Sequence, residues 1–212
     1  MSGDLPFIVI QVLALLFAVS CHESAHGWVA WKCGDPTAKD LGRISLNPLR
    51  HIDPVGSVLL PALLAFSGAP VFGWARPVPI VLARTRNRRR AHLLISAAGP
   101  VSNLLLAIAW ALPAMALRPA AAGGALPPEL LFYLAFSSVL INVVLALFNL
   151  LPIPPLDGFG VVESLLPSSL EPAARGMRRY GMILLVVVIF SGGLQLLLGP
   201  PLRVLSGWLL GL

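Results

Sequence analysis

Long apolar stretches, separated by short basic ones, dominate the pattern along the chain. The first stretch, residues 5–21, carries no charge, and a helix with its polar residues on one face extends it to about Val29. Such a helix can cross a hydrocarbon layer about 30 Å thick, because each residue adds about 1.5 Å. Further spans are predicted at residues 91–117, 130–151 and 180–198, the last of them loosened by Gly192 and Gly193. The pattern predicts an all-α polytopic membrane protein with about four spanning helices.

Two other apolar segments are less regular. Residues 54–74 are apolar, but prolines and glycines interrupt them. Because basic residues flank this segment on both sides, the positive-inside rule favours a re-entrant loop over a crossing. Irregular backbone at that depth needs shelter from protein or from a water-filled cavity. The short C-terminal tail, residues 202–212, either lies at the interface or extends the fourth span after a break at Pro200 and Pro201.

Composition and charge support a membrane protein. The chain is 57% hydrophobic and 11% charged, whereas soluble domains average about one quarter charged residues. With the N-terminus outside, all of the 15 Lys and Arg residues except Arg118 and Arg203 fall on the cytoplasmic side. The arginine-rich run 84–90 is expected to anchor this topology at anionic headgroups. Nucleic acid is not expected as a partner, because no aromatic residues interleave the run. Cys21 and Cys33 are expected to be free thiols.

Polar residues gather near the inner end of the first span, in His22-Glu23-Ser24-Ala25-His26. On a helix, residues four apart lie one above the other, so His22 and His26 can hold one Zn²⁺. Glu23 lies between them as a candidate general base, the arrangement known as H-E-x-x-H. Ionisable residues in an apolar span indicate function. The alternative is that they lie past the membrane edge and face water; His22, however, is only about 25 Å along the helix.

A catalytic zinc usually has three protein ligands, so a third must come from elsewhere in the chain. Asp157 follows the third span in the stretch 149–158, where three prolines are expected to break the helix and leave an extended segment. The predicted topology brings Asp157 to the level of the two histidines, and Gly158 would let the chain turn sharply beside the carboxylate. Asp157 could also serve as the N-cap of a short helix over 159–166, a role compatible with metal binding.

Together these residues resemble the site-2 protease family of intramembrane zinc metalloproteases, in its compact prokaryotic branch without PDZ or CBS domains. The resemblance rests on the stretch 22–26 and on Leu156-Asp157-Gly158. Residues 99–103, Gly-Pro-Val-Ser-Asn, are similar to the family's glycine-to-asparagine motif. The stretches 46–54 and 72–79 also look like this branch.

The resemblance implies one intramembrane metalloprotease domain over residues 1–212, with a core at 5–165 and an accessory C-terminal span at 180–212. The implied reaction is hydrolysis of peptide bonds within or next to a transmembrane segment of a membrane-protein substrate, with Glu23 as the catalytic base. The expected location is a prokaryotic cell membrane, with the active site near the cytoplasmic face. The implied ligands of one zinc ion per chain are His22, His26 and Asp157.

Other polar residues are compatible with more than one role. By resemblance, Asn149 would hold the substrate backbone and Asn103 would support the active site. Asn103 and Asn142 could equally be polar contacts between helices. His51 is open between a spare ligand, a substrate contact and an interfacial histidine without special role, and His92 is expected only at the interface. A second function also stays open, that of a zinc-binding membrane scaffold without proteolytic activity.

Overall fold

The computed structural model describes residues 5–68, 73–122 and 126–212, and the regular elements in these ranges are all helical. The gaps fall at the N-terminus, within the predicted re-entrant segment, and between the second and third predicted spans, so these parts of the predictions lie outside the described residues. A short π-helix, Pro54–Leu59, runs directly into α3. The α-helices are, in chain order, α1 (Leu5–Lys32), α2 (Thr37–Asp40), α3 (Leu60–Ser67), α4 (Arg88–Ala121), α5 (Leu126–Asn149), α6 (Asp157–Leu165), α7 (Glu171–Phe190) and α8 (Gly193–Leu210).

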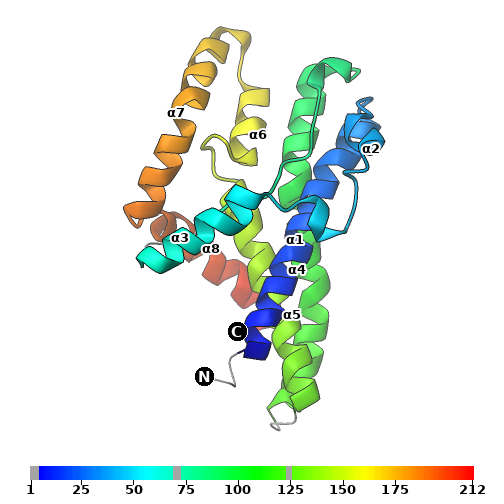
Figure 1. The fold of residues 1–212 in the computed structure, drawn as a ribbon, viewed down its shortest axis with the longest axis vertical. Coiled ribbons are helices and arrows are strands. Elements are labelled where there is room, and N and C mark those ends of the chain that lie inside the picture. Colours follow the sequence, from blue (N-terminus) through cyan, green and yellow to red (C-terminus); the bar gives the residue numbers. More distant parts are fainter. Residues whose placement is uncertain (1–4, 69–72, 123–125) are drawn as a thin grey trace.

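Three long helices, α1, α4 and α5, pack against one another and form the centre of the fold (Figure 1). Each of them carries an apolar stretch long enough to cross a membrane. The first three predicted spans are therefore confirmed, with helix ends a few residues from the predicted ones. Asn87 sets the start of α4, because its side chain accepts a hydrogen bond from the backbone N–H of Arg90 at 3.0 Å.

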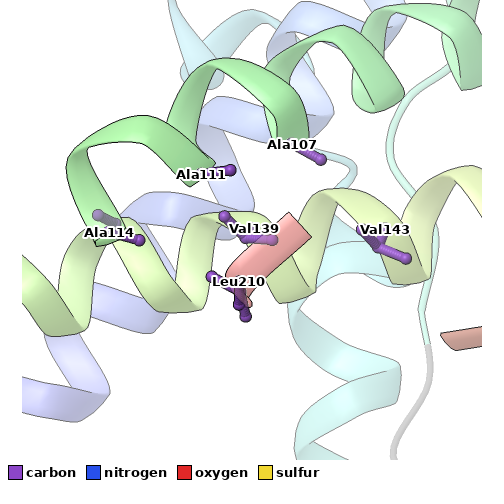
Figure 2. Packing of buried hydrophobic residues seen from close by; sticks show 7 residues of the cluster. Ala107, Ala111, Ala114, Val139, Val143 and Leu210 are labelled. Carbon is purple, nitrogen blue, oxygen red and sulfur yellow. The ribbon is translucent and has the colours of Figure 1, made fainter. Parts of the chain in front are cut away.

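Small side chains let α4 and α5 approach each other closely. Ala107 and Ala111 lie one turn apart on α4 and pack with Val139 and Val143 of α5 in one buried cluster (Figure 2). Leu210 of α8 joins the same cluster. Close packing of this kind is a main source of helix association inside a bilayer, where lipid is as apolar as the side chains. It fixes the position of α4, on which the metal centre described below depends.

The C-terminal region differs from the prediction. The fourth predicted span, residues 180–198, is sharply bent rather than only loosened at its glycines, because α7 and α8 meet at an angle of 74°. The break falls at Gly192, whose φ of +76° is a left-handed conformation that glycine adopts without steric cost. Pro200 and Pro201, the predicted break, lie inside α8, so most of the predicted tail 202–212 belongs to that helix. If the bent pair is one span, the chain has four spans by length and composition.

The described parts of the predicted re-entrant segment begin and end at the same place beside the bundle. Asp53 begins it by accepting hydrogen bonds from the backbone N–H groups of Val55 and Gly56. The N–H of Trp74 donates to the carbonyl of Gly56 at 3.1 Å, so the two ends of the segment meet. The π-helix and α3 together are too short to cross a layer about 30 Å thick. In Figure 1, α3 projects away from the long helices, and its Phe66 is 92% exposed.

The connection from α5 to α6 also differs from its predicted form. Instead of an extended segment, residues 150–156 form tight turns, in which Ile153 N donates to the carbonyl of Leu151 and Leu156 N to that of Ile153. The prolines do end α5 as predicted. The turns satisfy part of the backbone that the broken helix releases, which is the requirement at membrane depth. They return the chain toward α4, against which α6 packs.

Candidate metal centre

The two histidines of α1 lie one turn apart and point to the same side of the helix. Both are buried, and their ring centroids are 4.7 Å apart. Room for two imidazoles between α1 and α4 comes from Gly99, since a Cβ there would lie 2.5 Å from atoms of both His22 and His26. Only glycine fits at this close approach of the two helices.

Asp157 completes a triangle with these histidines, as the sequence predicts. Its Oδ2 lies 3.1 Å from Nε2 of His22 and 3.3 Å from Nε2 of His26. The two Nε2 atoms are themselves 3.1 Å apart. Three candidate ligand atoms, drawn from α1 and α6, therefore converge on one point.

The remaining ring nitrogens determine which way the lone pairs point. His22 Nδ1 lies 2.6 Å from Oδ1 of Asn103, and His26 Nδ1 lies 2.7 Å from the carbonyl of Ile95. Both partners are acceptors, so both Nδ1 atoms carry hydrogen and a neutral ring has its lone pair on Nε2. Asp157 Oδ2 is buried, and although it lies within ion-pair distance of the rings it has no hydrogen bond of normal geometry. A buried carboxylate oxygen without a hydrogen bond is suited to bind a cation.

These atoms fit zinc. Tetrahedral zinc with bonds of about 2.0–2.1 Å to nitrogen and oxygen places its ligand atoms about 3.3 Å apart, close to the three separations found here. Two imidazoles and one carboxylate are also a ligand set of catalytic zinc sites, which leave the fourth position open. Each histidine is oriented by a hydrogen bond from its other nitrogen, as metal-ligating histidines usually are.

Asp157 is the first residue of α6 rather than its N-cap. Leu156 occupies the cap position, so the alternative role predicted for Asp157 is wrong: its carboxylate turns toward the histidines instead. Gly158 lies within the helix, where it permits close contact with the carbonyl of Leu150 rather than a sharp turn.

Glu23 follows His22 on α1, and its carboxylate is held by a group outside the helix. Its Oε2 accepts a hydrogen bond from the backbone N–H of Val78 at 2.9 Å. Val78 is buried in an extended segment, residues 73–81, that passes over this side of α1. Asp35 fixes the same segment, because its Oδ2 accepts a hydrogen bond from Val81 N at 2.6 Å.

The two asparagines of the long helices form a buried chain behind His22. Asn103 accepts from His22, and its Nδ2 donates to Oδ1 of Asn142 at 2.8 Å. Asn142 in turn donates to the carbonyl of Ser138. Asn103 thus contacts a histidine and also bridges α4 and α5, which joins the two interpretations given for it from the sequence.

The other predicted site residues lie outside the triangle. Asn149, the last residue of α5, is half-buried and donates to the carbonyl of Leu145. His51 is buried, and its Nε2 lies 2.8 Å from the carbonyl of Ser45. His92 faces α6, with Nε2 3.9 Å from a carboxylate oxygen of Glu163.

Backbone groups near the centre were not predicted from the sequence. The carbonyl of Ile95 orients His26, and the amide of Val78 holds Glu23. Every residue carries these groups, so residue type gives no signal for them. Only the packing of α1 against α4 and the course of segment 73–81 reveal their roles.

Fold and site together indicate a polytopic membrane protein with a candidate metal centre of two histidines and one aspartate. Comparison with known proteins agrees: a model of peptidase family M50 matches residues 120–191. The chain is 39% identical over 196 residues to "Putative zinc metalloprotease YwhC" of Bacillus subtilis, covering 88% of this chain and 81% of that protein.

Two mycobacterial relatives carry the same name, "Putative zinc metalloprotease Rip2". The chain is 30% identical over 190 residues to the one from Mycolicibacterium smegmatis, covering 88% of this chain and 69% of the relative. It is 31% identical over 205 residues to the one from Mycobacterium tuberculosis H37Rv, covering 96% and 71%. No solved structure matches the chain. The chain belongs to peptidase family M50, the site-2 proteases, and is a zinc metalloprotease.

Proposed function

We propose that this metalloprotease hydrolyses peptide bonds within or next to transmembrane segments of membrane proteins. One observation carries the proposal: the buried triangle of His22, His26 and Asp157 lies beside Glu23 among helices of membrane-spanning length. A metal centre in that position can be reached by a substrate that itself lies in the bilayer. The proposal treats residues 1–212 as one domain, with 5–165 as its core.

Each residue of the centre has one role in this proposal. His22, His26 and Asp157 hold zinc, which when bound supplies Lewis-acid activation of water and of the scissile carbonyl. Glu23 accepts the proton of the attacking water and delivers it to the leaving amine. The Val78 amide keeps the Glu23 carboxylate in place between these steps. A helical substrate hides its carbonyls in hydrogen bonds, so substrates with Gly or Pro near the scissile bond are favoured.

Three further residues support the site in this proposal. Asn103 orients His22 through its side-chain oxygen. Asn149, at the end of α5, binds the unwound substrate backbone. His51 holds the loop around Ser45, whose carbonyl also accepts a hydrogen bond from Ser24 of α1. His51 is thus a positioning residue rather than a ligand.

Orientation in the membrane follows from the charges. We place the active site near the cytoplasmic face of a prokaryotic cell membrane. The basic residues around the ends of α1, α4 and α7 support this placement through the positive-inside rule. In this orientation, water from the cytoplasm reaches the centre through the region of the re-entrant segment.

The test measures zinc per chain and cleavage of single-span substrates by the purified protein in liposomes. Wild type is expected to hold about one zinc and to cleave. Glu23→Gln should keep zinc and lose cleavage, whereas Asp157→Ala should lose zinc. Glu171→Gln, on the exposed start of α7, is the matched carboxylate control and should keep both properties.

Other outcomes have defined meanings. Cleavage by Glu23→Gln at the wild-type rate would overturn the role of Glu23. A cellular phenotype that survives Glu23→Gln, with zinc bound and no substrate cut by wild type, would instead support the zinc-binding scaffold. Full zinc occupancy in Asp157→Ala would overturn the ligand set.

A further inference from the structure

A groove on the surface of the α1–α4 pair is separate from the candidate metal centre. It encloses about 620 Å³ between the end of α1 and the first turns of α4. A backbone hydrogen bond joins the two chain segments at the end of the groove near Cys33, because Arg86 N donates to the carbonyl of Cys33 at 3.0 Å. Among its lining residues are Trp28, Lys32, Arg86, Arg90, Leu94 and Val101.

Cations line only one end of this groove. Lys32, Arg86 and Arg90 are all exposed there. In the described part of the chain, no carboxylate lies within ion-pair distance of these three side chains. Lys32 Nζ instead lies over the rings of Trp28 and Trp31, at 5.6 and 4.6 Å from their centroids. The neighbouring Arg89 points elsewhere, since it donates to carbonyls at the end of α6.

The rest of the groove is apolar. Leu94, Ala97, Ala98 and Val101 continue it down α4. From Arg90 to Val101 the helix rises about 16 Å, which is about half of a 30 Å hydrocarbon layer. Trp28 lies between the charged and the apolar parts of the groove. Tryptophan is enriched at membrane interfaces, so this position agrees with a boundary between headgroups and acyl chains. The groove therefore combines a cationic head site with an apolar channel one leaflet deep.

We propose that this groove is a binding site for an anionic phospholipid. The phosphate group lies among Lys32, Arg86 and Arg90, and an acyl chain runs along α4 past Leu94 toward Val101. Basic pockets between helices are known to hold anionic headgroups. The charge and the length of the groove together select this occupant over a zwitterionic lipid or a soluble phosphate. The proposal is independent of proteolytic activity.

The experiment titrates the purified full chain in detergent with phosphatidylglycerol or phosphatidylcholine of identical acyl chains and counts bound lipid by native mass spectrometry. Wild type should retain one phosphatidylglycerol at least tenfold more tightly than phosphatidylcholine. Glycerol 3-phosphate, the soluble headgroup, should not displace it. The decisive variant combines Lys32→Gln, Arg86→Gln and Arg90→Gln. It should bind phosphatidylglycerol on the order of 100-fold more weakly, since each basic residue contributes roughly fivefold.

Matched variants separate a built site from general attraction to a basic surface. Arg88→Gln combined with Arg175→Gln and Arg179→Gln removes the same charge outside the groove and should leave binding unchanged. Ala98→Phe keeps every cation but fills the apolar channel, and it should lose the bound lipid while retaining zinc. Arg86→Gln alone, an exposed substitution that spares folding, should weaken binding roughly fivefold.

Contrary results would each overturn the proposal. Equal retention of the two lipids by wild type would mean that the cations do not select the headgroup. Undiminished preference in the triple groove variant or in Ala98→Phe would place the lipid elsewhere. Displacement by glycerol 3-phosphate would mean that the acyl channel has no part in binding.

Discussion

At the scale of single residues, the histidines of α1 depend on acceptors from α4. Asn103 and the carbonyl of Ile95 hold both Nδ1 hydrogens, which leaves both Nε2 lone pairs directed at Asp157. A histidine without such a partner can rotate or change tautomer, and its affinity for metal then falls. The ligand atoms and the groups that orient them thus form one unit.

Replacing Asn103 tests this unit. Asn103→Leu removes the acceptor of His22 at similar volume, so zinc affinity should fall about 10- to 100-fold. Competition with a chelator measures the change. Asn142→Leu breaks the bond between α4 and α5 but leaves Asn103 beside His22, so it should affect stability more than zinc binding. Equal zinc loss in both variants would mean that Asn103 acts only as a contact between helices.

A second prediction at the scale of single residues concerns Gly99. A Cβ at this position would overlap both imidazoles, so Gly99→Ala should reduce zinc occupancy and destabilise the fold by about 1–3 kcal/mol. Zinc analysis and thermal unfolding in detergent measure both effects. Gly176→Ala on α7 is the control, because a Cβ there meets open space and alanine favours a helix. Normal zinc binding by Gly99→Ala would contradict the close packing at the centre.

Residue types predicted which three side chains come together but not what surrounds them. His22, His26 and Asp157 were found from spacing and from the cost of ionisable groups near a membrane, and the structure brings them together. The Val78 amide and the Ile95 carbonyl were not found, since main-chain groups leave no trace in the sequence. The N-cap role of Asp157 failed because the cap rule considers only local bonds, whereas the carboxylate faces another helix.

At the scale of elements, segment 73–81 is positioned by Asp35. The Asp35 carboxylate accepts hydrogen bonds from Thr37 and from Val81 N, and Arg84 lies nearby. Burial raises the pKa of Asp35, but these partners outweigh burial and hold the pKa below its usual value. The ionised form is therefore favoured by folding, and its contribution to stability is complete above the unfolded pKa of about 3.9.

Asp35→Asn should destabilise the protein by about 1–3 kcal/mol at pH 7, because the amide has one acceptor oxygen, so either Thr37 or the Val81 N–H loses its acceptor. As pH falls through the lowered pKa of Asp35, wild type loses the same stabilisation, so the difference between the proteins should narrow below about pH 4. SDS titration in mixed micelles measures unfolding. Asp40 is an exposed aspartate in the same region of the chain, so Asp40→Asn is the control and should change stability little. A constant difference across pH would refute the linkage.

α6 is held in place by its neighbours on both sides. Arg178 of α7 makes a two-pronged ion pair with Glu163 of α6, while Arg89 of α4 donates to the carbonyls that end α6. Because α6 begins with Asp157, these contacts also fix the carboxylate of the metal centre. The sequence predicted the short helix but gave no indication of these anchors.

Arg178→Gln should therefore destabilise the fold by about 1 kcal/mol, a modest value because the side chain is half-exposed. It should also lower zinc affinity, which a chelator titration measures. Arg175→Gln removes an exposed pair with Glu171 on the same helix and should change both quantities little. Identical effects of the two variants would show that the Arg178 pair does not support α6.

At the scale of the whole molecule, charge predicts the orientation in the membrane. Ser169, between α6 and α7, should face the cytoplasm, and Ala122, after α4, the opposite side. Ser169→Cys and Ala122→Cys, each in a background without native cysteines, should react with an impermeant thiol reagent from opposite sides of sealed vesicles. Both positions are exposed, so labelling needs no unfolding. Labelling of both from one side would contradict the topology.

The order of long helices was predictable because an apolar run of membrane length has few alternatives to a spanning helix. The end of the chain was not. The sequence predicted loosening at Gly192 and Gly193 and a break at Pro200 and Pro201, yet the helix breaks at Gly192, where the backbone is left-handed. Glycine only permits such a conformation, and the packing of α8 against α5 decides whether it is used. Sequence pattern alone does not contain that packing.

The contact between Glu23 and Val78 has a consequence for genetics. Pro77 and Pro79 lack backbone N–H groups, so within this tripeptide only Val78 can donate. Alanine scanning would keep that donor at position 78, and a library of substitutions there would remove it only through proline. A main-chain contact to the proposed base would thus look dispensable in an ordinary mutational screen, and Val78→Pro is the allele that exposes it.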